Sequence, residues 1–190
     1  MGALDRWGLT IYDVIASGDF VVIDTETTGL HNPQIVQVAI IGSQGEVLLD
    51  ALVNPGCAIP PQATAIHGIT NEMTCRAGSY YTYEPILDHL LSGTNILCYN
   101  ASFDCNALQG SALADGMKSK NWYALSPWHC VMTEFARIYG EWNEYHGNYR
   151  WQKLSTAARY YGIEQPTAHT ALADAQTTLA VARAMLAGKE

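Results

Sequence analysis

Apolar residues in the first half of the chain follow a pattern that is typical of strands. Short β-branched runs, bounded by turn residues, predict strands at 20–24, 35–41, 47–53 and 95–99. The tight turn Gly42-Ser43-Gln44-Gly45 is expected to join the second strand to the third. A short fifth strand is expected near Trp122 and Tyr123, inside an otherwise irregular segment.

Helical spacing dominates the second half of the chain. The periodicity predicts helices at 83–91, 101–114, 130–139, 154–161 and 170–186. A short helix within 4–16, a helical piece after Pro61 and an aromatic-rich loop at 140–151 complete the pattern. Because helices alternate with strands and then dominate, we expect an α/β domain with one sheet covered by helices.

Two carboxylates stand at the end of the first predicted strand. Asp24 and Glu26 are two residues apart, so their side chains point to the same face of the strand. The carboxyl ends of strands are where open α/β sheets place their ligands. Paired carboxylates there suit a hard cation such as Mg²⁺ or Mn²⁺, which prefers oxygen ligands.

Two further acidic positions follow later elements. Asp104 falls in the first turn of the helix after the fourth strand, close to the first strand if the two are neighbours. His169 and Asp174 are five residues apart, about 140° around a helix, so they cannot share a helix face. We therefore expect His169 in the loop before the last helix and Asp174 in its first turn.

These motifs together resemble those of the DnaQ-like exonucleases of the DEDDh type. The resemblance lies in four successive motifs: Asp24-Thr25-Glu26-Thr27-Thr28-Gly29-Leu30, Ile66-His67-Gly68-Ile69-Thr70, Asn100-Ala101-Ser102-Phe103-Asp104, and His169 with Asp174. A related subfamily has tyrosine four residues before the last aspartate, but position 170 here is Thr. The resemblance covers 20–186 and implies a single exonuclease domain, 1–190, in which 1–17 is an N-terminal extension and 20–186 the catalytic core.

The resemblance implies an RNase H-like fold, with a central five-stranded mixed sheet flanked by helices, and 3′→5′ exonuclease activity. It implies two divalent cations, Mg²⁺ or Mn²⁺, held by Asp24, Glu26, Asp104 and Asp174. His169 would be the general base that activates the attacking water. The residues expected to contact the terminal nucleotide are Thr27, Leu30, His67, Asn100 and Phe103.

For several of these residues a structural role is an open alternative. His67 can be a hydrogen-bonded histidine in a turn, Asn100 can cap a helix, and Phe103 can belong to the core. The aromatic residues of 141–151 can stack on unpaired bases or can fix the loop to the helices. Three substitutions relative to the family pattern lie outside the five catalytic positions and leave substrate preference open: Gln37, Tyr99 and Cys130.

Composition and charge narrow the function further. The chain has 190 residues, of which 48% are apolar and 15% charged, and a net charge of −8. That charge argues against binding along a long duplex, whereas two divalent cations would add four positive charges beside a bound strand end. The five cysteines, without a CxxC pair, are expected to be buried free thiols in a reducing compartment.

The expected compartment is the cytoplasm. No run approaches the roughly 18 apolar residues of a membrane span, and charged residues interrupt the N-terminal stretch where a secretion signal would be apolar. The expected partner is a nucleic acid with a free 3′ end, single-stranded or frayed, and most simply DNA. Alternatives are an RNA-trimming exoribonuclease, a polymerase-associated proofreading subunit, for which no docking tail is apparent, and a catalytically dead binding module.

Overall fold

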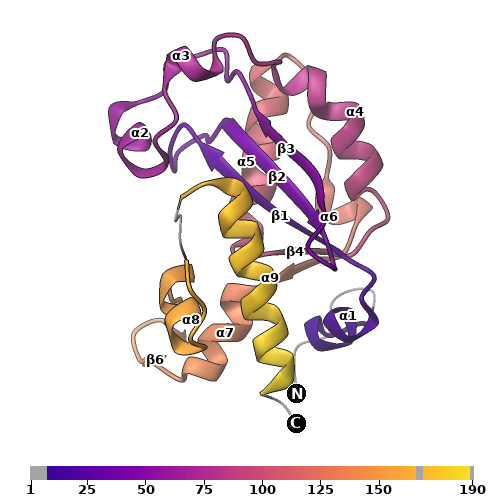
Figure 1. Ribbon diagram of the computed structural model, residues 1–190, viewed down its shortest axis with the longest axis vertical. Helices are drawn as coiled ribbons and strands as arrows, with labels where there is room; N and C mark the ends of the chain where they lie inside the picture. Colours follow the sequence, from indigo (N-terminus) through magenta and orange to yellow (C-terminus); the bar gives the residue numbers. More distant parts are fainter. Residues whose placement is uncertain (1–7, 166–168, 189–190) are drawn as a thin grey trace.

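The computed structural model describes residues 8–165 and 169–188, which fold around one mixed sheet (Figure 1). Its five strands, in the order β3-β2-β1-β4-β5, are β1 (Val21–Thr27), β2 (Ile35–Gly42), β3 (Val47–Leu52), β4 (Ile96–Cys98) and β5 (Trp128–Cys130). β2 runs antiparallel to both β1 and β3, whereas β4 runs parallel to both β1 and β5. The expectation of a five-stranded mixed sheet flanked by helices is confirmed.

Helices cover both faces of this sheet. One face carries α1 (Ile11–Ser17), α7 (Val131–Tyr139), α8 (Leu154–Tyr160) and α9 (Ala171–Ala187). The other face carries α4 (Tyr80–Leu91), α5 (Ala101–Ala114) and α6 (Trp122–Leu125). Two short helices, α2 (Pro61–His67) and α3 (Asn71–Thr74), lie beyond the end of β1 (Figure 1).

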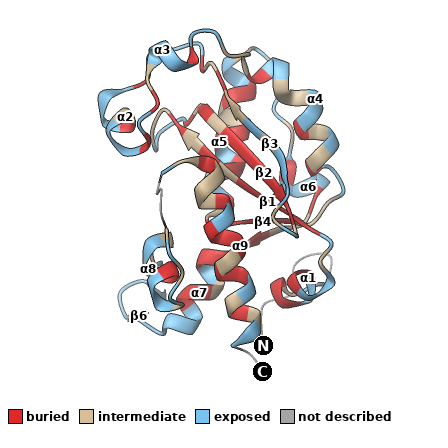
Figure 2. Cartoon of the chain, in the orientation of Figure 1, coloured by how far each residue is buried: buried red, intermediate tan, exposed pale blue. Residues whose placement is uncertain are grey.

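The strand β1 is central because its side chains are buried on both faces. Val22 packs in the cluster under α9, whereas Val21 and Ile23 pack in the cluster under α5. Burying such aliphatic side chains stabilises the fold by about 1.5–3 kcal/mol each. In Figure 2 the strands β1, β2 and β4 are accordingly coloured as buried along most of their length, whereas the edge strand β3 is more exposed. Side-chain alternation along β1 then places Asp24 and Glu26 on the α9 face and Thr25 on the α5 face.

Polar caps set where two of the helices begin. The Thr10 side chain accepts a hydrogen bond from the Asp13 backbone N–H, and the Asp13 carboxylate accepts one from the Thr10 backbone N–H. The Thr170 hydroxyl accepts from the Ala173 N–H at 3.3 Å and so fixes the first turn of α9. That turn contains Asp174, as the spacing predicts.

The predicted fifth strand near Trp122 and Tyr123 is wrong. These residues belong to α6, whose N-cap Asn121 accepts a hydrogen bond from the Ala124 N–H at 3.2 Å. The fifth strand is instead β5, which has only three residues and contains the polar His129, so it lacks a recognisable strand pattern. The segment expected as a loop at 140–151 contains a small hairpin of β6 (Trp142–Asn143) and β7 (Asn148–Tyr149).

Within the described part of the chain, no helix combines the length and the apolar character that crossing a membrane requires. Of the five free cysteines, Cys98 and Cys105 are buried, Cys130 is half-buried, and Cys57 and Cys75 are exposed. The expectation that the thiols are free is confirmed, whereas the expectation that they are all buried holds for only part of the set.

Candidate active site

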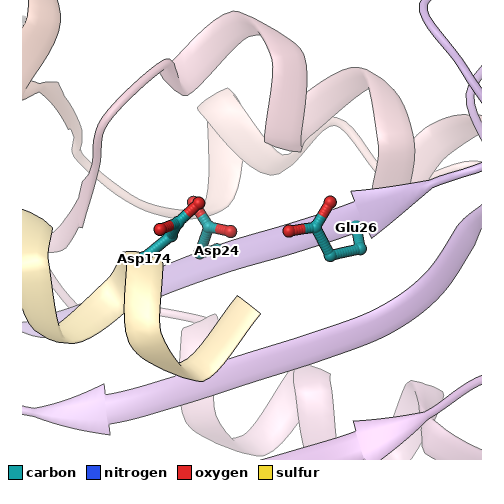
Figure 3. A group of neighbouring side chains, drawn as sticks. All are labelled: Asp24, Glu26 and Asp174. Carbon is teal, nitrogen blue, oxygen red and sulfur yellow. The ribbon is translucent and has the colours of Figure 1, made fainter. Parts of the chain in front are cut away.

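Three carboxylates converge at the end of β1. Ligand oxygens of Asp24, Glu26 and Asp174 all lie within 4.8 Å of one another (Figure 3). Asp24 and Glu26 come from the same face of β1, and Asp174 comes from the first turn of α9, which packs on that face. Residues 150 positions apart in the sequence therefore share one small volume because α9 begins over the end of the central strand.

Asp104 approaches the same place from the other face of the sheet. It lies in the first turn of α5 and is buried, and its Oδ1 accepts a hydrogen bond of 2.8 Å from the Thr25 hydroxyl. β4, the neighbour of β1, ends at Cys98, and α5 starts three residues later. Asp104 lies outside the group of three, but its charge raises the pKa of Asp24, so the four carboxylates form one electrostatic cluster.

Burial and mutual repulsion make this cluster hard to ionise. Burial raises the pKa of Asp24 well above its usual range, and the charges of the other three carboxylates raise it further. Burial, followed by the charges of Asp174 and Asp104, raises the pKa of Glu26 to about 7. Burial also raises the pKa of Asp104 to about 7, although the Thr25 hydroxyl counteracts it. A concentrated negative charge of this kind fits a divalent cation, which would relieve the repulsion.

His169 lies in the loop immediately before α9. Its backbone has a φ of 69°, in the left-handed region, and its side chain is exposed. The His169 backbone donates a hydrogen bond to the Asp174 carboxylate, and this bond, together with the charge of His169, partly offsets the burial that raises the pKa of Asp174. The structure therefore places the predicted general base directly beside the predicted ligands.

Four of the five residues expected to contact a nucleotide line one cavity. This cavity, of about 480 Å³, is bordered by Thr27, Leu30, His67 and Phe103, and by Glu26 of the carboxylate cluster. Leu30 is 80% exposed, so its side chain is available to an incoming ring. Phe103 is half-buried at the cavity wall and is absent from the buried core.

His67 is held by the backbone on both sides of its ring. Nδ1 accepts from the Ile69 N–H at 3.0 Å, which leaves the proton on Nε2 to donate to the Thr27 carbonyl at 3.2 Å. Burial lowers the pKa of His67 and so favours this neutral form. His67 therefore joins α2 to the end of β1. Both of its ring nitrogens are hydrogen-bonded to the backbone, which corresponds to the structural alternative for this residue.

The fifth residue, Asn100, faces a different cavity. That cavity, of about 520 Å³, is lined by Asn100, Trp151 and Lys153 and by the two site residues His169 and Asp174. Asn100 occupies the N-cap position of α5, but its side chain makes no capping bond and accepts from the Ser102 hydroxyl at 3.0 Å. The carboxylate cluster thus has one cavity on the Glu26 side and another on the Asp174 side.

Sequence reasoning missed two residues that position the site. Thr25 was the middle of a motif, yet its hydroxyl orients Asp104. Gln37 on β2 accepts a hydrogen bond from the Ala171 N–H at 3.2 Å and donates one to Asp50 at 2.9 Å, so it ties the start of α9 to the sheet. Both contacts join segments at least 79 residues apart, and only the position of Thr25 between two acidic residues gave any signal.

A mixed five-stranded sheet that gathers four carboxylates and a histidine at the end of its first strand is the architecture of a metal-dependent nuclease with an RNase H-like fold. Residues 21–182 match the exonuclease family RNase_T. The chain is 36% identical over 174 residues to the exonuclease CP81 of Escherichia phage 186, an alignment that covers 90% of this chain and 89% of that protein. The chain therefore belongs to the RNase_T exonuclease family, and the predicted resemblance to DnaQ-like exonucleases is confirmed.

Other relatives extend this picture. The DNA polymerase III subunit epsilon of Treponema pallidum is 22% identical over 186 residues, which cover 95% of this chain and 81% of that protein. Exonuclease X in complex with 5′-overhanging duplex DNA has a similar structure, with a TM-score of 0.64 and 24% identity over 90% of this chain and 92% of that chain. A zinc-bound complex of Escherichia coli exonuclease I with single-stranded DNA gives a TM-score of 0.72 and 22% identity over 90% of this chain and 41% of that one. These two structures share the fold.

Proposed function

We propose that the protein is a 3′→5′ exonuclease that releases nucleoside monophosphates from the 3′ end of single-stranded or frayed DNA. The observation that carries this proposal is the convergence of Asp24, Glu26 and Asp174, with Asp104 and His169 beside them, between two cavities. Residues 20–186 act as the catalytic core within one domain.

The four carboxylates would hold two divalent cations, Mg²⁺ or Mn²⁺. The donor set is made entirely of carboxylate oxygens, and burial together with the mutual repulsion of these carboxylates raises the pKa values of Asp24 and Glu26. Bound cations would supply the Lewis acidity that stabilises the attacking and leaving oxygens of the displacement. Asp24, at the centre of the cluster, would contact both cations, and Asp104 would complete the site on the α5 side.

The histidine would move the proton. His169 would accept a proton from the attacking water, because its exposed side chain lies beside the cluster and an imidazole can act as a general base. A left-handed backbone is uncommon for residues other than glycine, and at His169 it sets how this residue is oriented before the start of α9. This geometry allows the general base to act beside Asp174 without sharing its helix face.

The cavity on the Glu26 side would receive the terminal nucleotide. Leu30 and Phe103 offer apolar surface to a base, and Thr27, whose backbone carbonyl is held by His67, also lines the cavity. A cavity of about 480 Å³ has the size of a small-ligand site, which suits a nucleotide. Exonucleolytic action from an end fits this arrangement, since a terminal nucleotide in the cavity would bring its own phosphate to the carboxylates.

A panel of labelled substrates tests the proposal. The 5′-labelled substrates are single-stranded DNA, single-stranded RNA, and duplex DNA with a matched or a mismatched 3′ end, each incubated with Mg²⁺, Mn²⁺ or EDTA. A stepwise ladder on single-stranded DNA that disappears with EDTA is expected. Faster cleavage of RNA would instead establish an exoribonuclease, and preference for a mismatched duplex end would indicate proofreading. If no nucleic acid is shortened with any cation, the proposed function is wrong.

A further inference from the structure

The segment after α7 carries aromatic and basic side chains that the proposed chemistry does not use. Trp142 is 48% exposed, Tyr145 90% and Trp151 63%. Four of the ten Lys and Arg residues of this acidic chain also fall within 137–159. In Figure 2 the β6–β7 hairpin is almost wholly exposed, so these side chains face solvent.

Trp151 lies where three cavities meet. One is the cavity that contains His169 and Asp174, a second is formed by the β6–β7 hairpin, and a third runs between that hairpin and α7. The second and third have volumes of about 600 and 350 Å³. A hollow surface therefore leads from the carboxylate cluster, past the Trp151 ring, to the hairpin.

The backbone on both sides of Trp151 is anchored. The Arg150 N–H donates to the Glu141 carbonyl at 2.8 Å, and the Gln152 carbonyl accepts from the Tyr99 hydroxyl at 2.8 Å. Tyr99 directly follows β4, so this bond ties Trp151 to the sheet that carries the site. A fixed position reduces the entropy that binding would otherwise cost.

Trp151 and the hairpin residue Trp142 differ in the contacts of their rings. Trp142 packs edge-on against Tyr149, with ring centroids 5.1 Å apart, and so stabilises the hairpin. The Trp151 ring makes no ring contact with any described residue. An anchored backbone with an exposed indole fits a stacking surface better than a staple between loop and helices.

The charge of this surface complements a phosphate backbone. Lys153 lines the same cavity as Trp151, His169 and Asp174, and it makes no ion pair with the residues that the structure describes. Arg150 borders the hairpin cavity and is only 3.5 Å from Glu141, in an exposed and therefore weak pair. In a chain of net charge −8, these two cations line the hollow surface that leads to the carboxylate cluster.

We propose that Trp151 and Lys153 bind the unpaired strand on the 5′ side of the scissile phosphate, with Trp151 stacked on a base and Lys153 near a phosphate. The inference rests on the proposed function: when the terminal nucleotide occupies the Glu26-side cavity, the Asp174-side cavity is available to the rest of the strand. Stacking on an indole needs a base that is free of its partner strand. The substrate class is therefore single-stranded DNA longer than the nucleotide in the active site.

The test compares a long single-stranded oligonucleotide with a minimal substrate, the 4-nitrophenyl ester of thymidine 5′-monophosphate, which carries no nucleotide on the 5′ side of its phosphate. In Trp151→Ala, the ratio of kcat/KM for the long substrate to kcat/KM for the minimal substrate is expected to decrease by a factor of about 5 to about 100. Trp151→Phe keeps a ring and should retain most of the ratio. The matched control is Tyr81→Ala, which removes an aromatic side chain that is 69% exposed on α4, the opposite face of the sheet.

A structural role for Trp151 would lower both rates together and leave the ratio as it is, and that result would overturn the inference. Binding supplies a second readout that does not need turnover. Fluorescence anisotropy of a 5′-labelled oligonucleotide is measured in EDTA with the His169→Asn protein. The double variant that also carries Trp151→Ala should bind the oligonucleotide more weakly. If the wild type cleaves no substrate, the proposed function is wrong, but the anisotropy still decides whether Trp151 binds the strand. Equal affinity with and without the indole would overturn the inference about Trp151 and leave the exonuclease proposal intact.

Discussion

Replacing Glu26 by glutamine should make the metal-free protein more stable while abolishing its activity. Burial and the charges of Asp174 and Asp104 raise the pKa of Glu26 from 4.5 to about 7. A shift of one pKa unit corresponds to about 1.4 kcal/mol, so ionising Glu26 in the folded protein costs about 3 kcal/mol. Glu26→Gln keeps the size of the side chain and removes this charge.

The sign of the pH dependence follows from the direction of the shift. Because the pKa of Glu26 is higher in the folded state, the folded protein retains a proton that the unfolded chain has lost. The free energy of unfolding of the metal-free wild type should therefore fall as the pH rises from about 4.5 to about 7, where Glu26 titrates in the unfolded and folded states respectively. Glu26→Gln should match the wild type below this range and exceed it by up to about 3 kcal/mol above it.

Urea denaturation in EDTA, followed across this pH range, measures the difference. Saturating Mn²⁺ should stabilise the wild type far more than the variant, because the cation offsets the repulsion that glutamine has already removed. Glu144→Gln, at an exposed position in the hairpin, is the matched control and should change neither curve. A variant that is less stable than the wild type in EDTA near neutral pH, or that shows the same pH slope, would refute the electrostatic account of the cluster.

Three further predictions follow from single contacts. His169→Asn should lose nearly all turnover yet melt like the wild type. His169→Ala should be equally inactive and also less stable by about 1 kcal/mol, because asparagine tolerates the left-handed backbone and alanine does not. Full activity in either variant would show that His169 is not the general base. Gly110→Ala should lower both Tm and activity, since its Cβ would lie 2.3 Å from the Pro33 carbonyl and would displace the helix that carries Asp104; thermal melting and a rate assay check this. Thr25→Val removes a hydrogen bond that lowers the pKa of Asp104, so the acid limb of the pH–rate profile should move to higher pH, and an unmoved limb would contradict that role.

Most of the fold was predictable where periodicity and burial agree. β2 begins at Ile35 and α5 spans 101–114 as expected, because each has a long, uniform pattern. The failures are short elements, whose local sequence gives too few turns or alternations to decide. α6 has four residues and β5 three, and their type is set by the Asn121 cap and by pairing with β4 rather than by their own pattern.

The site divides in the same way. The order of the acidic motifs indicated which residues would converge, because strand and helix geometry fixes where Asp24 and Asp174 point. Contacts between distant segments could not be predicted from local patterns. The hydrogen bond from Ala171 to Gln37 joins residues 134 positions apart, and the separation of Asn100 from the other nucleotide-contacting positions into a second cavity depends on how α8 packs.

The position of Gln37 shows how the sheet tolerates a cluster that opposes folding. Each carboxylate with a raised pKa makes the folded state less stable near neutral pH, so the surrounding structure must hold the cluster together. β1 does this through apolar side chains buried on both faces, and α9 is tied to β2 by a neutral amide. A glutamate at position 37 would add a further negative charge beside the first turn of α9, near Asp174, so the glutamine anchors the helix without increasing the repulsion. The metal-free protein should consequently tolerate Gln37→Glu less well than the metal-loaded one, since bound cations would offset the added charge.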